Sequence, residues 1–215
     1  MADKGDRVIC IVDSGVANLG SLVNAFSIVG SSVQVTRDPR IVERSSAIVL
    51  PGVGAFGDAM KVLRKNRLDG AIRRGAANGA SILGICLGVQ LLMQTSNEFG
   101  LHEGLALIDG SVERLPLDLP GTRVPNIGWR KTNWSERASL GPGETEEEKP
   151  YYYYVHGYHV LPADPKCIVA TTDFGGSPIV VAVESGRTLG VQFHPEKSQS
   201  DGLRLLERFS AGILP

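Results

Sequence analysis

The sequence predicts a single α/β domain spanning residues 1–215, built on a mostly parallel, doubly wound sheet flanked by helices. Two observations lead to this prediction. Up to Thr95, short apolar runs alternate with segments of helical periodicity, which is typical of parallel sheets. After Thr95 the pattern changes to closely spaced β-rich segments with one final helix, which indicates additional antiparallel strands in the C-terminal half.

The N-terminal half opens with the buried-strand pattern R-V-I-C-I-V, and each later strand ends at a turn signal. Asp38-Pro39 breaks the second strand, and the run Pro51-Gly52-Val53-Gly54 ends the third. In order, we expect strands at residues 7–12, 32–36, 47–50 and 81–85, and helices at residues 18–29, 56–64 and 68–78. A further apolar segment of helical character follows Cys86 without a loop.

The C-terminal half reads as strands separated by proline-rich and polar loops. We expect β-rich segments at residues 104–114, 126–134, 151–161, 167–173, 179–184 and 188–193, and a last helix at residues 202–211. Residues 116–125 form a loop with three prolines. Residues 140–150 contain four glutamates and are expected to form a mobile surface loop, in which the charges serve solvation.

Composition excludes several classes of function. A net charge of −1 gives no bulk attraction to nucleic acid, and no apolar stretch is long enough to span a membrane. The polar N-terminal residues lack the apolar core of a signal peptide, and the three widely spaced cysteines favour a reducing cytoplasm over a disulfide framework. Their spacing does not suit zinc, so we expect neither a metal nor a cofactor.

Cys86 stands at the junction between the predicted strand 81–85 and the helical segment that follows. A strand that becomes a helix within one or two residues must turn sharply, and Gly84 and Gly88 remove the side chains that would collide there. A lone apolar-flanked cysteine is usually a core residue. The two glycines instead favour a nucleophile held at the carboxyl end of a strand.

A cysteine nucleophile needs a base, and the base needs an orienting group. His194 directly follows the predicted strand 188–193, and Glu196 lies two residues further along. Since sites in open α/β sheets form beyond the carboxyl ends of the strands, Cys86 and His194 can meet there. We expect His194 to act as the base and Glu196 to orient its ring. The alternative interpretation of the motif H-P-E at residues 194–196 is a polar turn after an edge strand, without a catalytic role.

Two segments make the sequence similar to a known family. G-I-C-L-G-V-Q at residues 84–90 resembles the nucleophile segment of class I (triad-type) glutamine amidotransferases, and F-H-P-E-K at residues 193–197 resembles the segment with their histidine and glutamate. The resemblance covers nearly the whole chain. It implies the flavodoxin-like fold of that family, and hydrolysis of L-glutamine through a thioester on Cys86, with Cys86, His194 and Glu196 as the triad.

Acyl transfer also requires hydrogen-bond donors for the tetrahedral oxyanion. The elbow itself supplies the backbone N–H of Leu87. The resemblance assigns the second donor to the backbone N–H of Val53. It also implies that this N–H points away from the oxyanion until the partner subunit acts on the segment. Gly52 and Gly54 bracket Val53, and we expect these glycines to let the backbone reorient and to border the substrate.

The resemblance places further substrate contacts at Gln90, one helical turn after Cys86, and at the backbone of His156-Gly157-Tyr158. Many relatives carry serine or threonine where this chain has Gly157. A side-chain hydroxyl contact is therefore lost at that position, while backbone contacts of Gly157 and Tyr158 are retained.

Three further segments narrow the resemblance to the glutaminase subunits of imidazole glycerol phosphate synthase: V-D-S-G-V-A-N-L-G-S, P-G-V-G-A-F-G-D-A-M and N-I-G-W. That resemblance implies a heterodimer with a cyclase subunit of (β/α)8-barrel fold. It also implies that Asn18, Trp129, Tyr153 and Lys197 face this partner. Two alternatives stay open: the glutaminase subunit of pyridoxal phosphate synthase, and a catalytically silent interaction module of the same fold.

Overall fold

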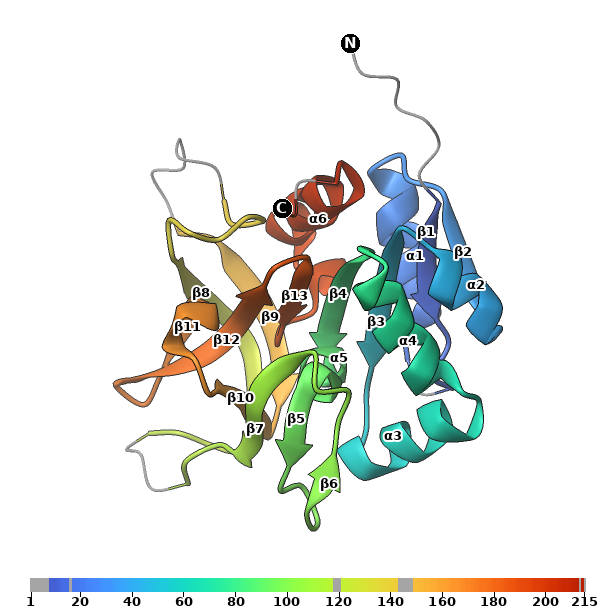
Figure 1. Ribbon diagram of the computed structural model, residues 1–215. Helices are drawn as coiled ribbons and strands as arrows, with labels where there is room; N and C mark the ends of the chain where they lie inside the picture. The colour runs from blue at the N-terminus through green and yellow to red at the C-terminus, as the bar shows by residue number, and fades with distance from the viewer. Residues whose placement is uncertain (1–7, 16, 118–120, 143–148, 213, 215) are drawn as a thin grey trace.

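A nine-stranded mixed sheet forms the centre of the molecule (Figure 1). The computed structural model describes residues 8–15, 17–117, 121–142, 149–212 and 214. In spatial order the strands are β2 (Val33–Thr36), β1 (Ile9–Val12), β3 (Ala47–Gly52), β4 (Ser81–Cys86), β13 (Thr188–Val191), β12 (Ser177–Ser185), β11 (Ile168–Phe174), β8 (Asn126–Trp134) and β9 (Tyr151–His156).

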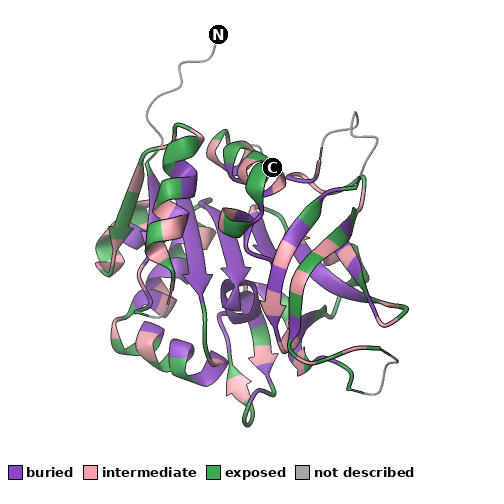
Figure 2. Ribbon diagram, turned by 180° about the vertical axis from the view of Figure 1, so that it is seen from behind, coloured by how far each residue is buried: buried purple, intermediate pink, exposed green. Residues whose placement is uncertain are grey.

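The strands from β2 to β13 are parallel to their neighbours, and those from β12 to β9 pair antiparallel. This arrangement confirms the predicted parallel sheet with antiparallel additions. β1, β3, β4 and β13 are buried along their whole length (Figure 2), which explains why their sequences are apolar runs without alternation.

Helices cover both faces of the parallel part. α1 (Leu19–Ile28) and α6 (Gln199–Ser210) share one apolar cluster, in which Phe26 and Phe209 are completely buried. α2 (Pro39–Arg44), α3 (Phe56–Lys65) and α4 (Leu68–Ala77) build the cluster of the opposite face. Helices on both faces of a parallel sheet make a doubly wound fold, as predicted.

A second, four-stranded sheet lies beside the carboxyl ends of the parallel strands (Figure 1). Its order is β10 (Tyr158–Pro162), β7 (Ile108–Arg114), β5 (Met93–Ser96) and β6 (His102–Glu103). The segment 151–161, predicted as one β-rich stretch, divides at Gly157 into β9 of the large sheet and β10 of the small one. The carbonyl of Gly157 accepts a hydrogen bond from the N–H of Leu115, which fixes the crossing point.

Two short elements depart from the sequence prediction. β2 ends at Thr36, before Asp38-Pro39 as expected, but the helix that follows was not predicted. Pro39 is the first residue of α2, and the Asp38 carboxylate caps it by accepting from the N–H of Arg40. The helical segment after Cys86 is the short α5 (Leu87–Leu92), and Met93 already belongs to β5.

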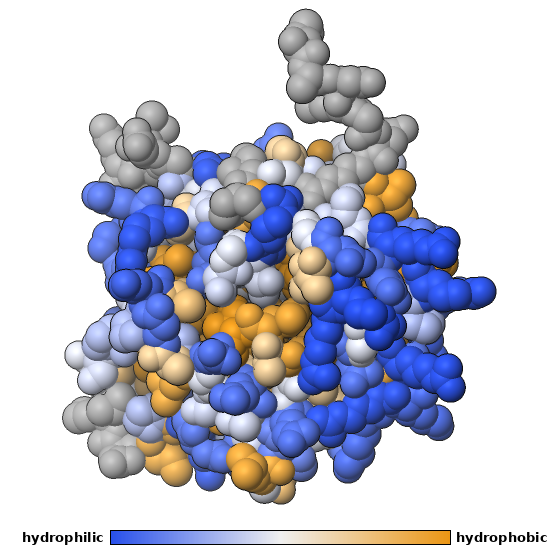
Figure 3. Space-filling view, viewed as in Figure 1, coloured by the Kyte–Doolittle hydropathy of each residue, from blue (hydrophilic) through white to orange (hydrophobic). Residues whose placement is uncertain are grey.

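The prediction of a surface loop at residues 140–150 is wrong at both ends, because Leu140, Gly141 and Pro150 are buried. Residues 143–148 of that loop, including the glutamates, lie outside the described residues, as do 118–120 of the proline-rich loop. On the face seen in Figure 3 the surface is mostly hydrophilic, with hydrophobic residues gathered near the centre. No helix in the described part of the chain is long and apolar enough to cross a membrane.

Candidate active site

Cys86 lies at a strained turn where β4 passes directly into α5. Its φ of +54° and ψ of −110° are unusual for a residue with a side chain. A Cβ on Gly88 would lie 1.8 Å from the carbonyl oxygen of Leu50, and one on Gly84 would lie 2.8 Å from the backbone of Gly88. The glycine spacing therefore reflects close backbone contact, and the predicted elbow is present.

We expect Gly88→Ala to lower the stability of the fold, because the contact with the Leu50 carbonyl involves backbone on both sides and no side chain can move to relieve it. Overpacking of this kind costs about 1–3 kcal/mol or more. Thermal unfolding followed by circular dichroism measures the loss. Gly20→Ala in α1 is the matched control, since nothing lies within 4 Å of its Cβ position. Equal melting temperatures for the two variants would contradict this account of the elbow.

His194 follows β13 and lies next to Glu196 of the short 3-10 helix η2 (Pro195–Lys197). Nδ1 of His194 is 2.8 Å from Oε1 of Glu196, and their side chains are only 4% and 5% exposed. Nε2 of His194 is buried and meets no partner in hydrogen-bond geometry, which leaves it available to the Cys86 thiol on the same pocket wall. Such contacts are often loose before substrate arrives.

The electrostatics of this group favour a protonated ring. Burial by itself lowers the pKa of His194, but the interactions with the Cys86 sulfur and the Glu196 carboxylate outweigh it and raise the pKa to about 10. Imidazolium is the form that His194 takes when it accepts the thiol proton. The structure thus brings the three predicted triad residues together with the electrostatics that proton transfer requires.

A closed ring of hydrogen bonds holds the backbone of His194. The N–H of His194 donates to the carbonyl of Tyr153 at 2.9 Å, and the N–H of Tyr153 donates to Oγ of Ser198 at 3.0 Å. The Ser198 hydroxyl donates to the carbonyl of His194 at 2.6 Å. His194 is therefore attached to the backbone of β9, at the residue whose side chain was predicted to face a partner.

A pocket of about 270 Å³ opens in front of Cys86. The predicted site residues among its lining are Val53, Gly54, Cys86, Leu87, Gln90, Gly157, Tyr158 and His194. Gly52 lines a smaller neighbouring pocket instead, together with Asn18, Val53 and Glu196. A Cβ on Gly157 would make only ordinary contact with Val124 at 3.6 Å, so the position has room for a Cβ.

The residues predicted to face a partner fall into two places. Trp129 and Tyr153 make an edge-to-face contact with ring centroids 6.1 Å apart, and Nζ of Lys197 lies 5.9 Å from the centre of the Tyr153 ring. These three residues form one surface cluster, and Trp129 is 45% exposed. Asn18 caps α1 by accepting from the N–H of Ser21, and it borders the smaller pocket together with His194 and Glu196.

Two buried polar residues at the site were missed by the sequence analysis. Gln192 is completely buried, with Nε2 3.9 Å from Sγ of Cys86 and Oε1 3.1 Å from Nε2 of Gln90. Its signal was a glutamine in an otherwise apolar run just before His194. Glu98 lines the pocket and accepts from the N–H of Phe56 at 2.6 Å, but its loop-like context N-E-F-G gave no signal.

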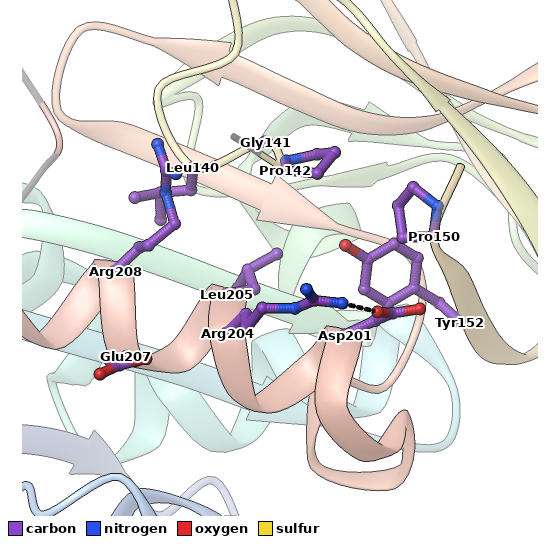
Figure 4. A pocket seen from close by; sticks show the side chains of 10 residues that line it. All are labelled: Leu140, Gly141, Pro142, Pro150, Tyr152, Asp201, Arg204, Leu205, Glu207 and Arg208. Carbon is purple, nitrogen blue, oxygen red and sulfur yellow. Dashed lines mark hydrogen bonds and ion pairs between the residues drawn. The ribbon is translucent and has the colours of Figure 1, made fainter. Parts of the chain in front are cut away.

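Another hollow lies between α6 and the start of β9 (Figure 4). Arg204 and Asp201 form an ion pair at its rim, and Asp201 also accepts from the N–H of Tyr151. No cysteine or histidine is among its lining residues, so it offers no catalytic set comparable to that around Cys86. Within the described residues, no cluster of three or more His, Cys, Asp or Glu could hold a metal.

Comparison with known proteins agrees with this geometry. Residues 10–211 match the family described as glutamine amidotransferase class-I. The chain is 41% identical over 206 residues to "Imidazole glycerol phosphate synthase subunit HisH" of Moorella thermoacetica, covering 94% of both chains. It is 42% identical over 200 residues to the protein of the same name from Aquifex aeolicus, covering 93% and 94%.

Solved structures show the same fold at lower identity. The structure of PurLQS from Thermotoga maritima matches with a TM-score of 0.74 at 21% identity, covering 98% of this chain and 100% of that one. A crystal structure of a glutamine amidotransferase matches with a TM-score of 0.72 at 16% identity, covering 95% and 99%. The chain belongs to the class I glutamine amidotransferases and, within them, to the family of imidazole glycerol phosphate synthase HisH subunits.

Proposed function

We propose that this chain is the glutaminase subunit of imidazole glycerol phosphate synthase and hydrolyses L-glutamine to glutamate and ammonia. The observation that carries the proposal is the pocket in which Cys86 and His194 meet, with Glu196 bonded to Nδ1 of His194. The alternative of a pyridoxal phosphate synthase subunit has no support from the relatives described above, which are HisH subunits.

The reaction follows from the positions of these groups. Nε2 of His194 takes the proton of the Cys86 thiol, and the sulfur attacks the carboxamide carbon of glutamine. When the tetrahedral intermediate collapses, the C–N bond breaks, and His194 returns the proton to the departing nitrogen as ammonia leaves. His194 then takes a proton from water as the water oxygen attacks the thioester carbon. The C–S bond breaks, glutamate leaves, and the proton returns from His194 to the Cys86 sulfur.

The oxyanion of both tetrahedral intermediates needs two donors. Leu87 is the first residue of α5, and its N–H follows Cys86 directly. Val53 is 42% exposed at the rim, where it lines both the main pocket and the smaller one. The N–H groups of these two residues are the proposed oxyanion donors, and such a donor is worth about 10²–10³ in kcat.

The substrate's amino-acid end is proposed to lie against Gln90, Glu98 and the backbone at Gly157 and Tyr158. All four residues line the pocket. Glu98 is the carboxylate residue in the lining of this pocket, and a carboxylate oxygen can accept from an α-ammonium group. Backbone N–H and carbonyl groups at the crossing between the two sheets suit the substrate's α-carboxylate and ammonium in the same way.

The partner in the proposal is a (β/α)8-barrel cyclase, bound as a heterodimer in the cytoplasm. The cluster of Trp129, Tyr153 and Lys197 supports it, because exposed aromatic and cationic side chains are typical anchors of an interface. The ammonia would pass through the barrel to phosphoribulosyl-formimino-AICAR phosphate and yield imidazole glycerol phosphate and AICAR. The test is to purify the chain together with a cyclase and to measure the formation of imidazole glycerol phosphate with glutamine as the nitrogen source. If product forms only when ammonium salts are added, the proposal is contradicted.

Within the triad, we expect Glu196→Gln to lose less activity than His194→Ala. The glutamine can still accept from Nδ1, whereas the charge that helps to raise the pKa of His194 is removed. His194→Ala removes the proton acceptor itself. Steady-state glutamate release by both variants, with the partner present, compares them. Greater damage in Glu196→Gln would mean that the carboxylate does more than orient and support the ring.

A further inference from the structure

A continuous chain of hydrogen bonds runs from the half-buried Arg130 on β8 to the wall of the pocket. Nε of Arg130 lies 3.1 Å from Oδ1 of Asn126, and Nδ2 of Asn126 lies 2.9 Å from Nε2 of His156. Nδ1 of His156 lies 2.9 Å from the carbonyl oxygen of Tyr158, which lines the pocket. Arg130 is the one member of these four that is charged.

The direction of donation along this series of hydrogen bonds is fixed from both ends. A guanidinium has no acceptor atom, so Arg130 must donate to Oδ1 of Asn126, and the Asn126 amide therefore turns its NH₂ group to His156. Nε2 of His156 must then accept, which places the single ring proton on Nδ1. The carbonyl of Tyr158 can only accept, so it requires the same tautomer independently.

The series of hydrogen bonds extends to Gln90, which donates to the same Tyr158 carbonyl. Nε2 of Gln90 lies 3.1 Å from the carbonyl oxygen of Tyr158 and 3.1 Å from Oε1 of Gln192. An amide NH₂ group has two hydrogens, and both are used by these contacts. Gln90 is therefore held with its carbonyl oxygen as the atom that can serve a ligand.

Burial makes the reverse orientation costly. Asn126 is 1% exposed, His156 and Gln90 are 5% exposed, and Gln192 is completely buried. In such surroundings a mispaired donor or acceptor loses its hydrogen bond without compensation from water. Burial also lowers the pKa of His156 to about 4, despite its bond to the Tyr158 carbonyl, so the ring stays neutral and keeps one acceptor nitrogen.

We propose that Arg130, Asn126 and His156 are positioning residues that hold the Tyr158 carbonyl in place for the Gln90 amide, so that the site presents the Gln90 oxygen as an acceptor and selects a ligand with an N–H donor at that place. The inference rests on the proposed function, since glutamine is taken as the ligand. None of the three positioning residues takes part in bond making. They act on glutamine affinity through Tyr158 and Gln90.

The test measures the dissociation constant of L-glutamine for the chain carrying Cys86→Ala, in which substrate binds without turnover. His156→Asn keeps an N–H donor near the place of Nδ1, whereas His156→Phe keeps the ring that packs against Tyr154 but has no nitrogen. We expect the Phe variant to bind glutamine about tenfold more weakly than the parent and the Asn variant to recover most of that loss. The opposite ranking would show that only ring packing matters and would overturn the proposal.

Arg130→Glu tests the direction of donation at the outermost of these hydrogen bonds, the one between Arg130 and Asn126, without disturbing the core. A carboxylate can only accept, so it would turn the Asn126 NH₂ group outward and place its oxygen against Nε2 of His156. Lys131→Glu is the matched control, since it makes the same charge change on the exposed side of the same strand. We expect Arg130→Glu to weaken glutamine binding about tenfold and Lys131→Glu to change it less than twofold; equal effects would overturn the proposal.

The ring nitrogens of His156 give a readout that does not depend on ligand. Their ¹⁵N chemical shifts should show the proton on Nδ1 in the parent chain, and a proton on Nε2 would overturn the inference whatever the binding data. If the parent binds no glutamine while the tautomer is as expected, the proposed function fails and the positioning role for glutamine falls with it. If the parent binds glutamine but none of the variants changes the affinity, only the positioning role fails.

Discussion

Replacing Cys86 with alanine should abolish glutamine hydrolysis and leave the fold intact. The side chain is small and lines the pocket; besides its interaction with His194, it makes weak polar contacts at 3.9 Å with the Val155 carbonyl and the Gln192 amide. Its removal therefore costs little packing. Without the sulfur no thioester can form, and loss of a triad nucleophile lowers kcat by roughly 10⁴-fold or more. Glutamate release with the cyclase partner present measures the effect.

Neither of the other cysteines can take over. Cys10 is buried within β1, and burial raises the pKa of its thiol despite a hydrogen bond with Ser45. Burial likewise raises the pKa of Cys167, which lies in the 3-10 helix η1 (Pro165–Cys167). Cys167→Ala is the matched control and should keep full activity. A glutamyl thioester trapped on Cys10 or Cys167 and identified by mass spectrometry would refute the assignment of Cys86.

The elbow could be predicted because its cause is local. Gly84 and Gly88 are required by contacts between consecutive elements, β4 and α5, and a neighbouring strand. The proximity of Cys86 and His194 was also predictable, because Cys86 ends β4 and His194 follows β13, and these two strands are parallel neighbours. In both cases the requirement of the fold, a tight turn or the end of a parallel strand, is what produces the recognisable sequence pattern.

The polar network behind the pocket was not predictable in this way. Asn126 faces His156 only because β8 and β9 pair in one particular antiparallel register. Gln90 reaches the Tyr158 carbonyl only because the chain changes sheets at Gly157. These contacts depend on how distant segments align, and nothing in the local composition around each residue encodes that alignment. The helix α2 was missed for a simpler reason, since Asp38-Pro39 is equally typical of a break and of a capped helix start.

Gly52 and Gly54 were both expected to let the backbone around Val53 reorient, and the structure favours Gly54 for this role. Gly52 belongs to β3 and pairs with Cys86 in β4, and a Cβ there would lie 3.1 Å from Leu87. A proline at Gly52 would therefore disturb a central strand as well as the segment. Gly54 has a φ of +99° with nothing within 4 Å of its Cβ position, so a side chain there changes the backbone preference alone.

The isolated subunit should be nearly silent and should gain roughly a hundredfold in glutamine hydrolysis when the cyclase binds. Such an activation needs only about 2.7 kcal/mol of differential stabilisation between two states of the oxyanion segment. The surface cluster of Trp129, Tyr153 and Lys197 is attached to the triad, because the Tyr153 carbonyl holds the N–H of His194. Glutamate release by the subunit, by the complex, and by the complex with an acceptor analogue measures the gain. Full activity of the isolated subunit would rule out this gate.

Gly54→Ala should raise the activity of the isolated subunit and reduce the factor by which the partner activates it. A residue with a side chain disfavours a φ of +99°, so the substitution destabilises the segment as it stands without its partner and shifts it toward the alternative. Gly176→Ala, at a φ of +81° with equally open surroundings in the turn between β11 and β12, is the control for a general loss of stability. If Gly54→Ala leaves the ratio of partner-stimulated to basal activity equal to that of the Gly176→Ala control, the gate does not lie in the segment around Val53.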